Sequence, residues 1–459
     1  MQSGLARIIK KGTAVLGHSL FSLPLLGLSL MLGGLPTTSA EAADVTVIHA
    51  GKLLAVPGQA PISPATLVIE DGKVKEVRAG HVDAAALGLG ADAKIIDLSD
   101  KFVMPGFIDL HVHLSFGANP DRTLIVTKPD SYFSLIAANN ARKTLMTGFT
   151  TVRDLGSPGT SVYALRDGIR DGLVPGPKIL VAGAAITPTG GHGDFHGYRD
   201  EVEKAMPAAG VCNGADDCRR AVRAAVKRGS DVIKVTSTGG TLSNTAAGTG
   251  QQFTDAELVA IAETAHALGR KVTAHAHDKA GIDSALRAGF DSIEHSMWAD
   301  EDTLRLFKKT GAWLIPTIYP ITYAGDTPEK MRNGPYKNAT PAVMAKLLKL
   351  GRQPKDMASK AYKMGVNIAL GTDSGVSPNG ENINEFIELV GIGMTPMEAL
   401  MAGTVKAAQA GGIEGVGKLA PGMAADVVAM PGDPLQDIKA VLGVDFVMRD
   451  GIVFKQDGK

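Results

Sequence analysis

Residues 105–113 read Pro105-Gly106-Phe107-Ile108-Asp109-Leu110-His111-Val112-His113, an apolar run that ends in two histidines. Such a short run of large apolar side chains predicts a buried β-strand. Alternate residues of a strand point to the same face, so His111 and His113 can present both rings to one metal ion. A doubly wound open sheet would instead place a glycine-rich phosphate-binding loop after its first strand. This stretch has no such loop and argues against that fold.

The chain that follows alternates strand-like and helix-like segments. Helical patterns lie between several of the strand-like runs; one of them begins with a capping box formed by Thr254 and Glu257 and extends to about Leu268. Eight strand–helix units predict an α/β fold of the (β/α)8 TIM-barrel type. The expected strands are residues 107–114, 150–155, 179–185, 232–238, 272–277, 292–295, 313–316 and 368–372.

Both ends of the mature chain read as short strands joined by glycine turns, as in Asp71-Gly72-Lys73 and Arg449-Asp450-Gly451. Each end by itself buries too little surface for independent stability. We therefore expect the two ends to pair into one small β-sandwich beside the barrel. The predicted limits are 44–103 and 413–459 for the two parts of the sandwich and 104–412 for the barrel.

The first 42 residues have the pattern of a secretory signal peptide. Arg7, Lys10 and Lys11 precede an apolar run at residues 20–32, and small residues lead to Ala42, near which cleavage is expected. The alternative is an uncleaved membrane anchor, but Pro24 and several glycines interrupt a run shorter than the roughly 20 residues that a span requires. The expected location is therefore secreted or periplasmic.

The composition restricts partners and metal ligands. The 459 residues include 47 basic and 47 acidic side chains, and this balance argues against an electrostatic grip on nucleic acid. We expect a small-molecule substrate, no nucleic acid, and no membrane after cleavage. Two cysteines cannot form a four-thiolate zinc site; in an exported protein, Cys212 and Cys218 are either a small disulfide loop or two free thiols. A metal must therefore rely mainly on histidines and carboxylates.

Unusual residues occur at the ends of the predicted barrel strands, where the reactive groups of such barrels lie. With the first two histidines they form a set of six candidate ligands: His111, His113, Lys234, His275, His295 and Asp373. Each residue alone also fits a structural role, as a core histidine, a salt-bridged lysine or a helix-capping aspartate. Six residues at similar depths favour a shared metal centre.

These positions carry the motifs through which the chain resembles the amidohydrolase superfamily. The motifs are Ile233-Lys234-Val235, His275-Ala276-His277, Ile293-Glu294-His295 and Gly371-Thr372-Asp373-Ser374, together with the His-Val-His stretch. Residues 231–234 and 187–193 are most similar to exported prolidase-like carboxypeptidases and ochratoxin-hydrolysing amidases.

The resemblance implies two divalent metal ions, with Zn²⁺ the expected metal. It assigns His111, His113 and Asp373 to one ion and His275 and His295 to the other, with Lys234 bridging both as a CO₂-derived carbamate. Chemistry supports the carbamate, because an ammonium group has no lone pair for a metal. The alternative is an unmodified Lys234 paired with an acid. The resemblance also implies a homo-oligomer, with an octamer as one arrangement.

The leading functional hypothesis is a binuclear metal-dependent amidohydrolase. It would cleave the amide bond to a C-terminal amino acid in dipeptides or N-acyl amino acids, including ochratoxin A, which would yield the acyl acid and phenylalanine. Asp373 would be catalytic, accepting a proton from the attacking water and passing it to the leaving amine. A lactonase or phosphotriesterase is one alternative, and a non-catalytic periplasmic binding protein is the other.

Further residues are expected near the substrate. His277 lies on the same strand face as His275 but nearer the barrel mouth, and the resemblance places a substrate-contacting histidine at His192. Tyr198 and Arg199 are candidates for holding a free carboxylate, with a solvated surface as the alternative. Arg153 and Asp154 are expected to form a buried pair with each other, and residues 319–336 are long enough for a lid over the mouth.

Overall fold

The computed structural model describes residues 44–90, 92–118, 123–206, 208–243 and 248–457. The predicted signal peptide, residues 1–42, lies outside the described residues and stays a prediction. Across the described ranges, no helix has both the length and the apolar character needed to cross a bilayer.

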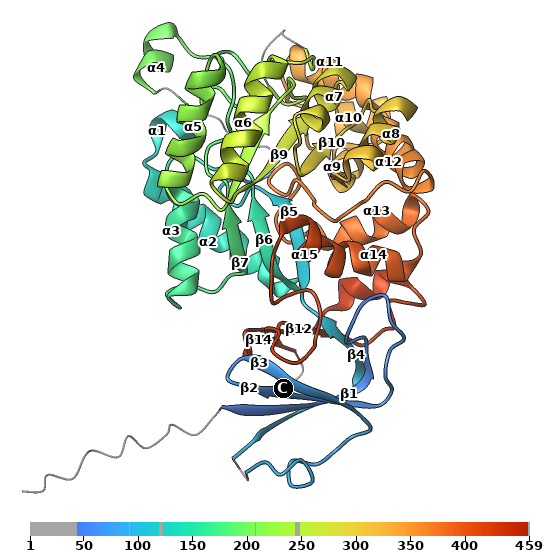
Figure 1. Cartoon of the computed structure of the whole chain (residues 1–459). Helices are drawn as coiled ribbons and strands as arrows, with labels where there is room; N and C mark the ends of the chain where they lie inside the picture. Colours follow the sequence, from blue (N-terminus) through green and yellow to red (C-terminus); the bar gives the residue numbers. More distant parts are fainter. Residues whose placement is uncertain (1–43, 91, 119–122, 207, 244–247, 458–459) are drawn as a thin grey trace, which may run out of the picture. The chain divides into compact units, whose positions relative to one another are not determined.

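Both chain ends contribute to one seven-stranded sheet in the order β14-β13-β12-β4-β1-β2-β3. β4 joins the two ends, because it pairs in parallel with β1 and antiparallel with β12. Figure 1 shows the blue N-terminal strands beside the red C-terminal ones. The strands are β1 (Val45–Leu53), β2 (Ala65–Glu70), β3 (Lys73–Ala79), β4 (Lys94–Pro105), β12 (Val427–Met430), β13 (Phe446–Arg449) and β14 (Ile452–Gln456).

Seven parallel strands form most of the barrel, in two sheets ordered β5-β6-β7 and β11-β10-β9-β8. They are β5 (Phe107–Val112), β6 (Phe149–Asp154), β7 (Lys178–Val181), β8 (Val232–Thr236), β9 (Lys271–Ala276), β10 (Ser292–His295) and β11 (Trp313–Ile315). Nearly every residue of β5, β6, β8, β9 and β10 is buried, as expected for parallel strands covered by helices. The predicted TIM barrel is confirmed.

The eighth predicted strand, residues 368–372, is not a regular strand in the structure. This segment closes the barrel by isolated parallel bridges, Leu314↔Ile368 on one side and Val112↔Ser374 on the other. Glycine is required in between, because a Cβ at Gly371 would lie 2.3 Å from the Cγ2 atom of Ile315 and 3.0 Å from the Cβ atom of His111. The close approach brings Asp373 beside His111, whose carbonyl oxygen accepts a hydrogen bond from the Asp373 amide at 2.7 Å.

Helices surround these strands, as Figure 1 shows for α2, α3, α5 and α6. The predicted capping box is present at α6, where Thr254 and Glu257 bond to each other's backbone amides. The helices are α1 (Leu124–Thr127), α2 (Asp130–Met146), α3 (Ser161–Arg170), α4 (Asp200–Ala205), α5 (Ala215–Lys227), α6 (Asp255–Ala267), α7 (Lys279–Arg287), α8 (Glu301–Thr310), α9 (Tyr319–Ala324), α10 (Pro328–Asn333), α11 (Pro341–Leu350), α12 (Gln353–Lys363), α13 (Glu385–Gly391), α14 (Pro396–Ala402) and α15 (Val405–Gly411), with short 3-10 turns η1 (Asn382–Asn384) and η2 (Ile438–Gly443).

Candidate metal centre

Three ligand atoms converge where β5 meets the closing segment. Asp373 Oδ1 lies 3.3 Å from His111 Nε2 and 3.2 Å from His113 Nε2, and the two nitrogens are 3.3 Å apart. We call these three residues the aspartate cluster. Ligands at the usual ~2.0–2.2 Å from a tetrahedral Zn²⁺ lie about 3.3–3.6 Å from one another, so the spacing fits a single ion.

The hydrogen bonds on the far side of each ring support a cation at this point. His111 Nδ1 lies 2.7 Å from Glu294 Oε2, and His113 Nδ1 lies 2.9 Å from the carbonyl oxygen of Gly156. Both acceptors require a proton on Nδ1, which leaves a lone pair on each Nε2 of the neutral ring. Two nitrogen lone pairs and a carboxylate therefore face one another, and a positive ion between them resolves the repulsion. The residues present fit a divalent metal.

Burial and charge keep His111 and Asp373 in the forms that bind metal. Burial, with Lys234 nearby, lowers the pKa of His111 to about 4. Burial alone would raise the pKa of Asp373, but His111 and the other neighbouring histidines outweigh it and hold that pKa well below its ordinary value. The aspartate is therefore an anion and His111 is neutral near neutral pH.

Lys234, His275 and His295 line the same cavity from β8, β9 and β10, and we call them the lysine group. The ring centroids of His275 and His295 are 4.8 Å apart, and the His295 ring lies 5.1 Å from that of His111. In contrast to the aspartate cluster, these residues include no carboxylate. Over the described part of the chain, the aspartate cluster is the only group of three or more His, Cys, Asp or Glu side chains whose ligand atoms lie within 4.8 Å of one another.

Lys234 has unusual surroundings for a lysine. It is buried, and burial lowers its pKa to about 8. The expected alternative, an ion pair with an acid within 4.0 Å, does not occur among the described residues. A lysine with a lowered pKa is a neutral amine more often than a surface lysine is, and the neutral amine is the form that reacts with CO₂.

Glu294, which the sequence interpretation did not assign a role, supports the aspartate cluster from β10. It is fully buried, and its Oε1 atom accepts a hydrogen bond from Arg153 at 2.8 Å and another from Thr273. Burial opposes its ionisation, but Arg153 and His111 outweigh burial and lower the pKa of Glu294 to about 2. One signal was present in the sequence: a carboxylate directly before His295 in a segment predicted to be a barrel strand.

The prediction that Arg153 and Asp154 form a buried pair with each other was wrong. Arg153 bonds to Glu294 and donates from Nε to the carbonyl oxygen of Leu110 at 2.6 Å. Asp154 instead accepts hydrogen bonds from the Leu114 amide and the Ser157 hydroxyl. Successive residues of a strand point to opposite faces, so the two side chains of β6 cannot meet.

The metal candidates open into a cavity of about 840 Å³. Its walls are mainly apolar, and their larger side chains include Phe116, Leu124, Phe133, Phe195, Tyr198, Met297, Ile321, Tyr336 and Leu347. Part of this wall comes from the predicted lid at residues 319–336, which forms α9, α10 and the turn to Tyr336. Such a cavity suits an apolar substrate that carries a few polar groups.

The residues predicted to contact substrate are not all brought to this cavity. His192 and His277 line it, with ring centroids 4.2 Å and 4.5 Å from that of His275. Tyr198 also lines it and stacks on Phe195 at 4.6 Å. Arg199 does not: its side chain is 84% exposed and pairs with Glu201 at 3.3 Å, because it immediately precedes the solvent-facing helix α4. Arg199 therefore lies on the solvated surface, which was the alternative to a role in holding the substrate carboxylate.

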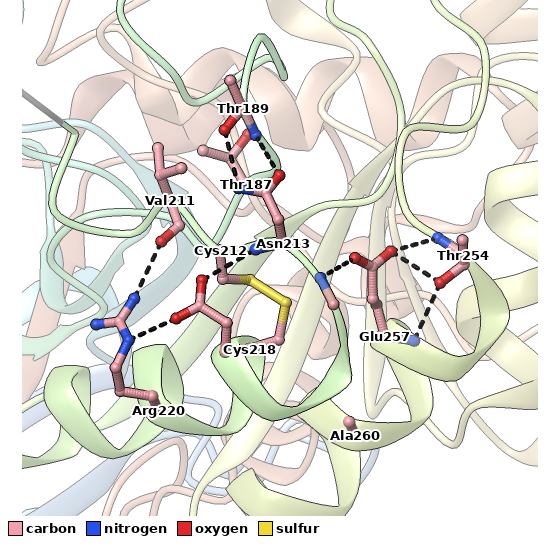
Figure 2. Close-up of a disulfide and its surroundings, with 12 residues drawn as sticks. Thr187, Thr189, Val211, Cys212, Asn213, Cys218, Arg220, Thr254, Glu257 and Ala260 are labelled. Atoms are coloured by element: carbon pink, nitrogen blue, oxygen red, sulfur yellow. Dashed lines mark hydrogen bonds and ion pairs between the residues drawn. A yellow bond between two sulfur atoms is a disulfide. The ribbon is translucent and has the colours of Figure 1, made fainter. Parts of the chain in front are cut away.

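A disulfide fixes the base of the loop that carries His192 (Figure 2). Cys212 bonds to Cys218 on α5, which decides between the two alternatives left open by the sequence. The Cys212 amide donates to the carbonyl oxygen of Thr187 at 3.0 Å, and the Asn213 side chain donates to the Thr189 hydroxyl at 2.9 Å. The next amide, of Gly214, donates to Glu257 on α6 at 2.6 Å. The loop is thus tied to two barrel helices.

Comparison with known proteins decides the family. The Amidohydrolase family matches residues 102–453, which is most of the chain and includes every candidate ligand. This chain belongs to the amidohydrolase family. As an amidohydrolase, it is a hydrolase that acts on amide bonds.

Individual relatives agree with this placement. An ochratoxinase of Aspergillus niger is 33% identical over 94% of this chain and 91% of its own. Its crystal structure superposes with a TM-score of 0.78, at 32% identity over 91% of this chain and 97% of that chain. The crystal structure of a Xaa-Pro dipeptidase with methionine bound in its active site reaches a TM-score of 0.81, at 34% identity over 90% of this chain and 100% of that chain.

Proposed function

We propose that this amidohydrolase is a binuclear metal-dependent enzyme that releases a C-terminal amino acid from dipeptides or N-acyl amino acids. The observation that carries the proposal is the convergence of two histidine lone pairs and the Asp373 carboxylate at the floor of a large apolar cavity. The similarity to an ochratoxinase and to a Xaa-Pro dipeptidase supports an amide bond to an amino acid as the target.

The chain's own residues have distinct roles in this proposal. His111, His113 and Asp373 would hold one ion, His275 and His295 the other, and Lys234 would bridge them as a carbamate. When bound, the two ions would supply Lewis-acid polarisation of the scissile carbonyl and a hydroxide at neutral pH. Zn²⁺ is the metal we propose, because imidazole and carboxylate are ligands it accepts readily.

Asp373 is proposed to move the proton. Its low pKa makes it an anion before reaction, and its Oδ1 atom lies at the centre of the aspartate cluster. It would accept a proton from the attacking water and deliver it to the nitrogen of the departing amino acid. A leaving amine must be protonated, so this transfer is what makes the amide, and not only an ester, a substrate.

His277 is proposed to contact the substrate. It is buried in the cavity wall, and its Nδ1 atom has no hydrogen-bond partner among the described residues. A buried ring nitrogen without a partner costs about 1–3 kcal/mol, and a polar group of the substrate would remove that cost. His192 and Tyr198 complete the proposed polar contacts, and the apolar walls would receive the acyl group and the amino-acid side chain.

A disulfide in the described structure supports our proposal that the protein is exported, because such bonds persist in oxidising compartments. We also propose a homo-oligomer, with an octamer as one arrangement; light scattering on the purified protein measures the subunit number.

The test of the proposed function is product identification by mass spectrometry. Zinc-loaded protein is incubated with a library of dipeptides, N-acyl amino acids and ochratoxin A, and with matched lactones and phosphotriesters. We expect free amino acids from the first set, loss of this activity with a chelator, and recovery with Zn²⁺. Cleavage of only the lactones or phosphotriesters would replace the proposal with the ester alternative, and ligand binding without turnover would indicate a binding protein.

A further inference from the structure

Residues with a left-handed backbone gather around the proposed metal centre. Four of the non-glycine residues with positive φ in the described chain lie at the ends of barrel strands: His295 (67°), Ser296 (55°), Thr317 (49°) and Asp373 (53°). Two of these are proposed ligands. Thr317 is the unexpected member, because a β-branched residue is rare in this region, where its backbone is strained. Such strain persists only where the surroundings enforce it.

Thr317 contacts His295 directly. Its hydroxyl oxygen lies 2.7 Å from His295 Nδ1 and 2.8 Å from the carbonyl oxygen of Pro316. A hydroxyl has one proton, and the Pro316 carbonyl can only accept, so the hydroxyl donates to Pro316. The hydroxyl must then accept from His295, which places a proton on Nδ1. The lone pair of the neutral ring is left on Nε2, as it is in His111 and His113.

Glu385 at the start of α13 holds the chain immediately after Thr317. It is fully buried, and its two carboxylate oxygens accept hydrogen bonds from the amides of Ile318 and Tyr319, each at 2.8 Å. With both following amides fixed, Thr317 cannot relax to a negative φ without breaking a buried hydrogen bond. Glu385 thereby enforces the strained conformation that aims the Thr317 hydroxyl.

Two further glutamates tie the same segment to the region of α13. Glu381 accepts a hydrogen bond from the Tyr319 hydroxyl at 2.6 Å, and Glu388 accepts one from Thr322 at 2.7 Å. This segment forms α9, and Pro320 and Ile321 of α9 line the cavity. The cavity wall and the support of His295 therefore belong to one connected unit.

We propose that Thr317 and Glu385 are positioning residues for His295: Glu385 enforces the backbone of Thr317, and the Thr317 hydroxyl fixes the ring orientation and tautomer with which His295 meets a metal ion. The inference rests on the proposed function, which makes His295 a ligand. A glycine at 317 would adopt the same φ without strain but would have no hydroxyl for His295. The strained threonine is thus explained by its side chain.

The experiment measures zinc affinity at each of the two sites by competition with a chelator. The variants are Thr317→Val, which removes the hydroxyl at constant shape; Thr317→Ser, which keeps it; Thr317→Gly, which removes both hydroxyl and strain; and Glu385→Gln. The matched control is Thr264→Val on α6. The Thr264 hydroxyl is also buried and donates to a carbonyl oxygen, that of Ala260, at 2.7 Å, but it does not line the cavity.

We expect Thr317→Val and Thr317→Gly to lower the affinity for one ion, the one assigned to His275 and His295, by about 10- to 100-fold. Removal of a partner that orients a metal-ligating histidine has an effect of this size. Thr317→Ser should restore most of that affinity. Glu385→Gln should weaken binding of the same ion at a pH above about 8, where the Glu385 carboxylate is ionised and accepts both backbone hydrogen bonds, whereas an amide oxygen replaces only one of its two acceptors. Thr264→Val should leave both affinities at the wild-type value.

Each other outcome overturns a specific part of the account. Wild-type affinity for both ions in Thr317→Gly overturns the inference, and this variant remains informative if Thr317→Val does not fold, because glycine relieves the strain. Equal weakening in Thr264→Val also overturns it, since the effect would then reflect general destabilisation. A wild-type protein that binds no metal contradicts the proposed function itself.

Discussion

Two buried glutamates support the two parts of the proposed metal centre in different ways. Glu294 holds His111 of the aspartate cluster and is paired with Arg153 at 2.8 Å. Glu385 supports His295 of the lysine group through Thr317, and its described partners are two backbone amides. Arg153 and His111 outweigh burial and lower the pKa of Glu294 to about 2, whereas burial raises the pKa of Glu385 to about 8.

This difference in pKa between the two glutamates determines which part of the centre is sensitive to pH. A guanidinium remains charged at any working pH, so the Glu294 support is a permanent anion. Among the residues that the structure describes, Glu385 has no such cationic partner, and Glu388 and Asp109 nearby add negative charge. We therefore expect the aspartate cluster to be the rigid part of the centre and the lysine group to be the part that varies with pH and mutation.

The largest effect is expected when the aspartate cluster loses its base. Asp373→Asn should lower kcat by about 10²- to 10⁴-fold, because an amide cannot accept the proton. Metal analysis of the same sample should still find bound zinc on the remaining histidines. Full activity in this variant contradicts the role of Asp373.

The Glu294 support can be removed with Glu294→Gln. This change leaves the Arg153 charge unpaired in the core, and we expect a loss of about 3–5 kcal/mol in the free energy of unfolding. The ion at the aspartate cluster should also bind about 10- to 100-fold more weakly. Denaturant unfolding and chelator competition measure the two effects.

A double variant separates the effect of Glu294→Gln on stability from its effect on zinc affinity. Adding Arg153→Met to Glu294→Gln removes the unpaired charge and should recover most of the stability, while zinc affinity stays low because His111 still lacks its carboxylate. Recovery of both quantities together would mean that Glu294 acts only through the stability of the barrel.

The disulfide provides a test of stability away from both glutamates. Cys212→Ser with Cys218→Ser should lower the free energy of unfolding by about 2 kcal/mol, the chain-entropy value for so short a loop. Zinc affinity at both sites should not change, because the bond supports the His192 loop and touches neither Glu294 nor Thr317. A change in zinc affinity would show that general loosening is enough to disturb the centre.

The smallest expected effect is a difference in pH dependence. Glu385 has an ordinary pKa of 4.5 that burial raises to about 8, so between these values the folded state holds a proton that the unfolded state has lost. Its contribution to stability is therefore fully present below pH 4.5 and is lost as pH rises to 8. Relative to Glu385→Gln, the wild type should lose stability over this range, with a slope of at most about 1.4 kcal/mol per pH unit. Parallel profiles would contradict this.

Much of the architecture follows from local sequence patterns. The strand-like runs, the capping box of Thr254 and Glu257, and the paired chain ends are all visible in the sequence, because each depends on neighbouring residues or on simple limits of buried area. The eighth strand was predicted as regular but is held only by isolated bridges, since the close approach at Gly371 leaves it little room for a ladder.

The supporting residues are harder to predict. The candidate ligands stand in motifs at strand ends, and the structure brings all six to one cavity. Glu385 is remote in sequence from Thr317, and no motif marks their contact, which depends on how α13 packs beside α9. For Arg153, the alternation of side chains along a strand already excludes Asp154 as a partner. The actual partner, Glu294, lies on another strand, and the sequence does not show that the two strands bring these side chains together.

The most direct test is anomalous diffraction at the zinc absorption edge from crystals of the zinc-loaded wild-type protein. We expect two peaks, one among His111, His113 and Asp373 and one beside His275 and His295, with electron density for one added CO₂ on Lys234 between them. A map with no peak at these side chains would contradict it.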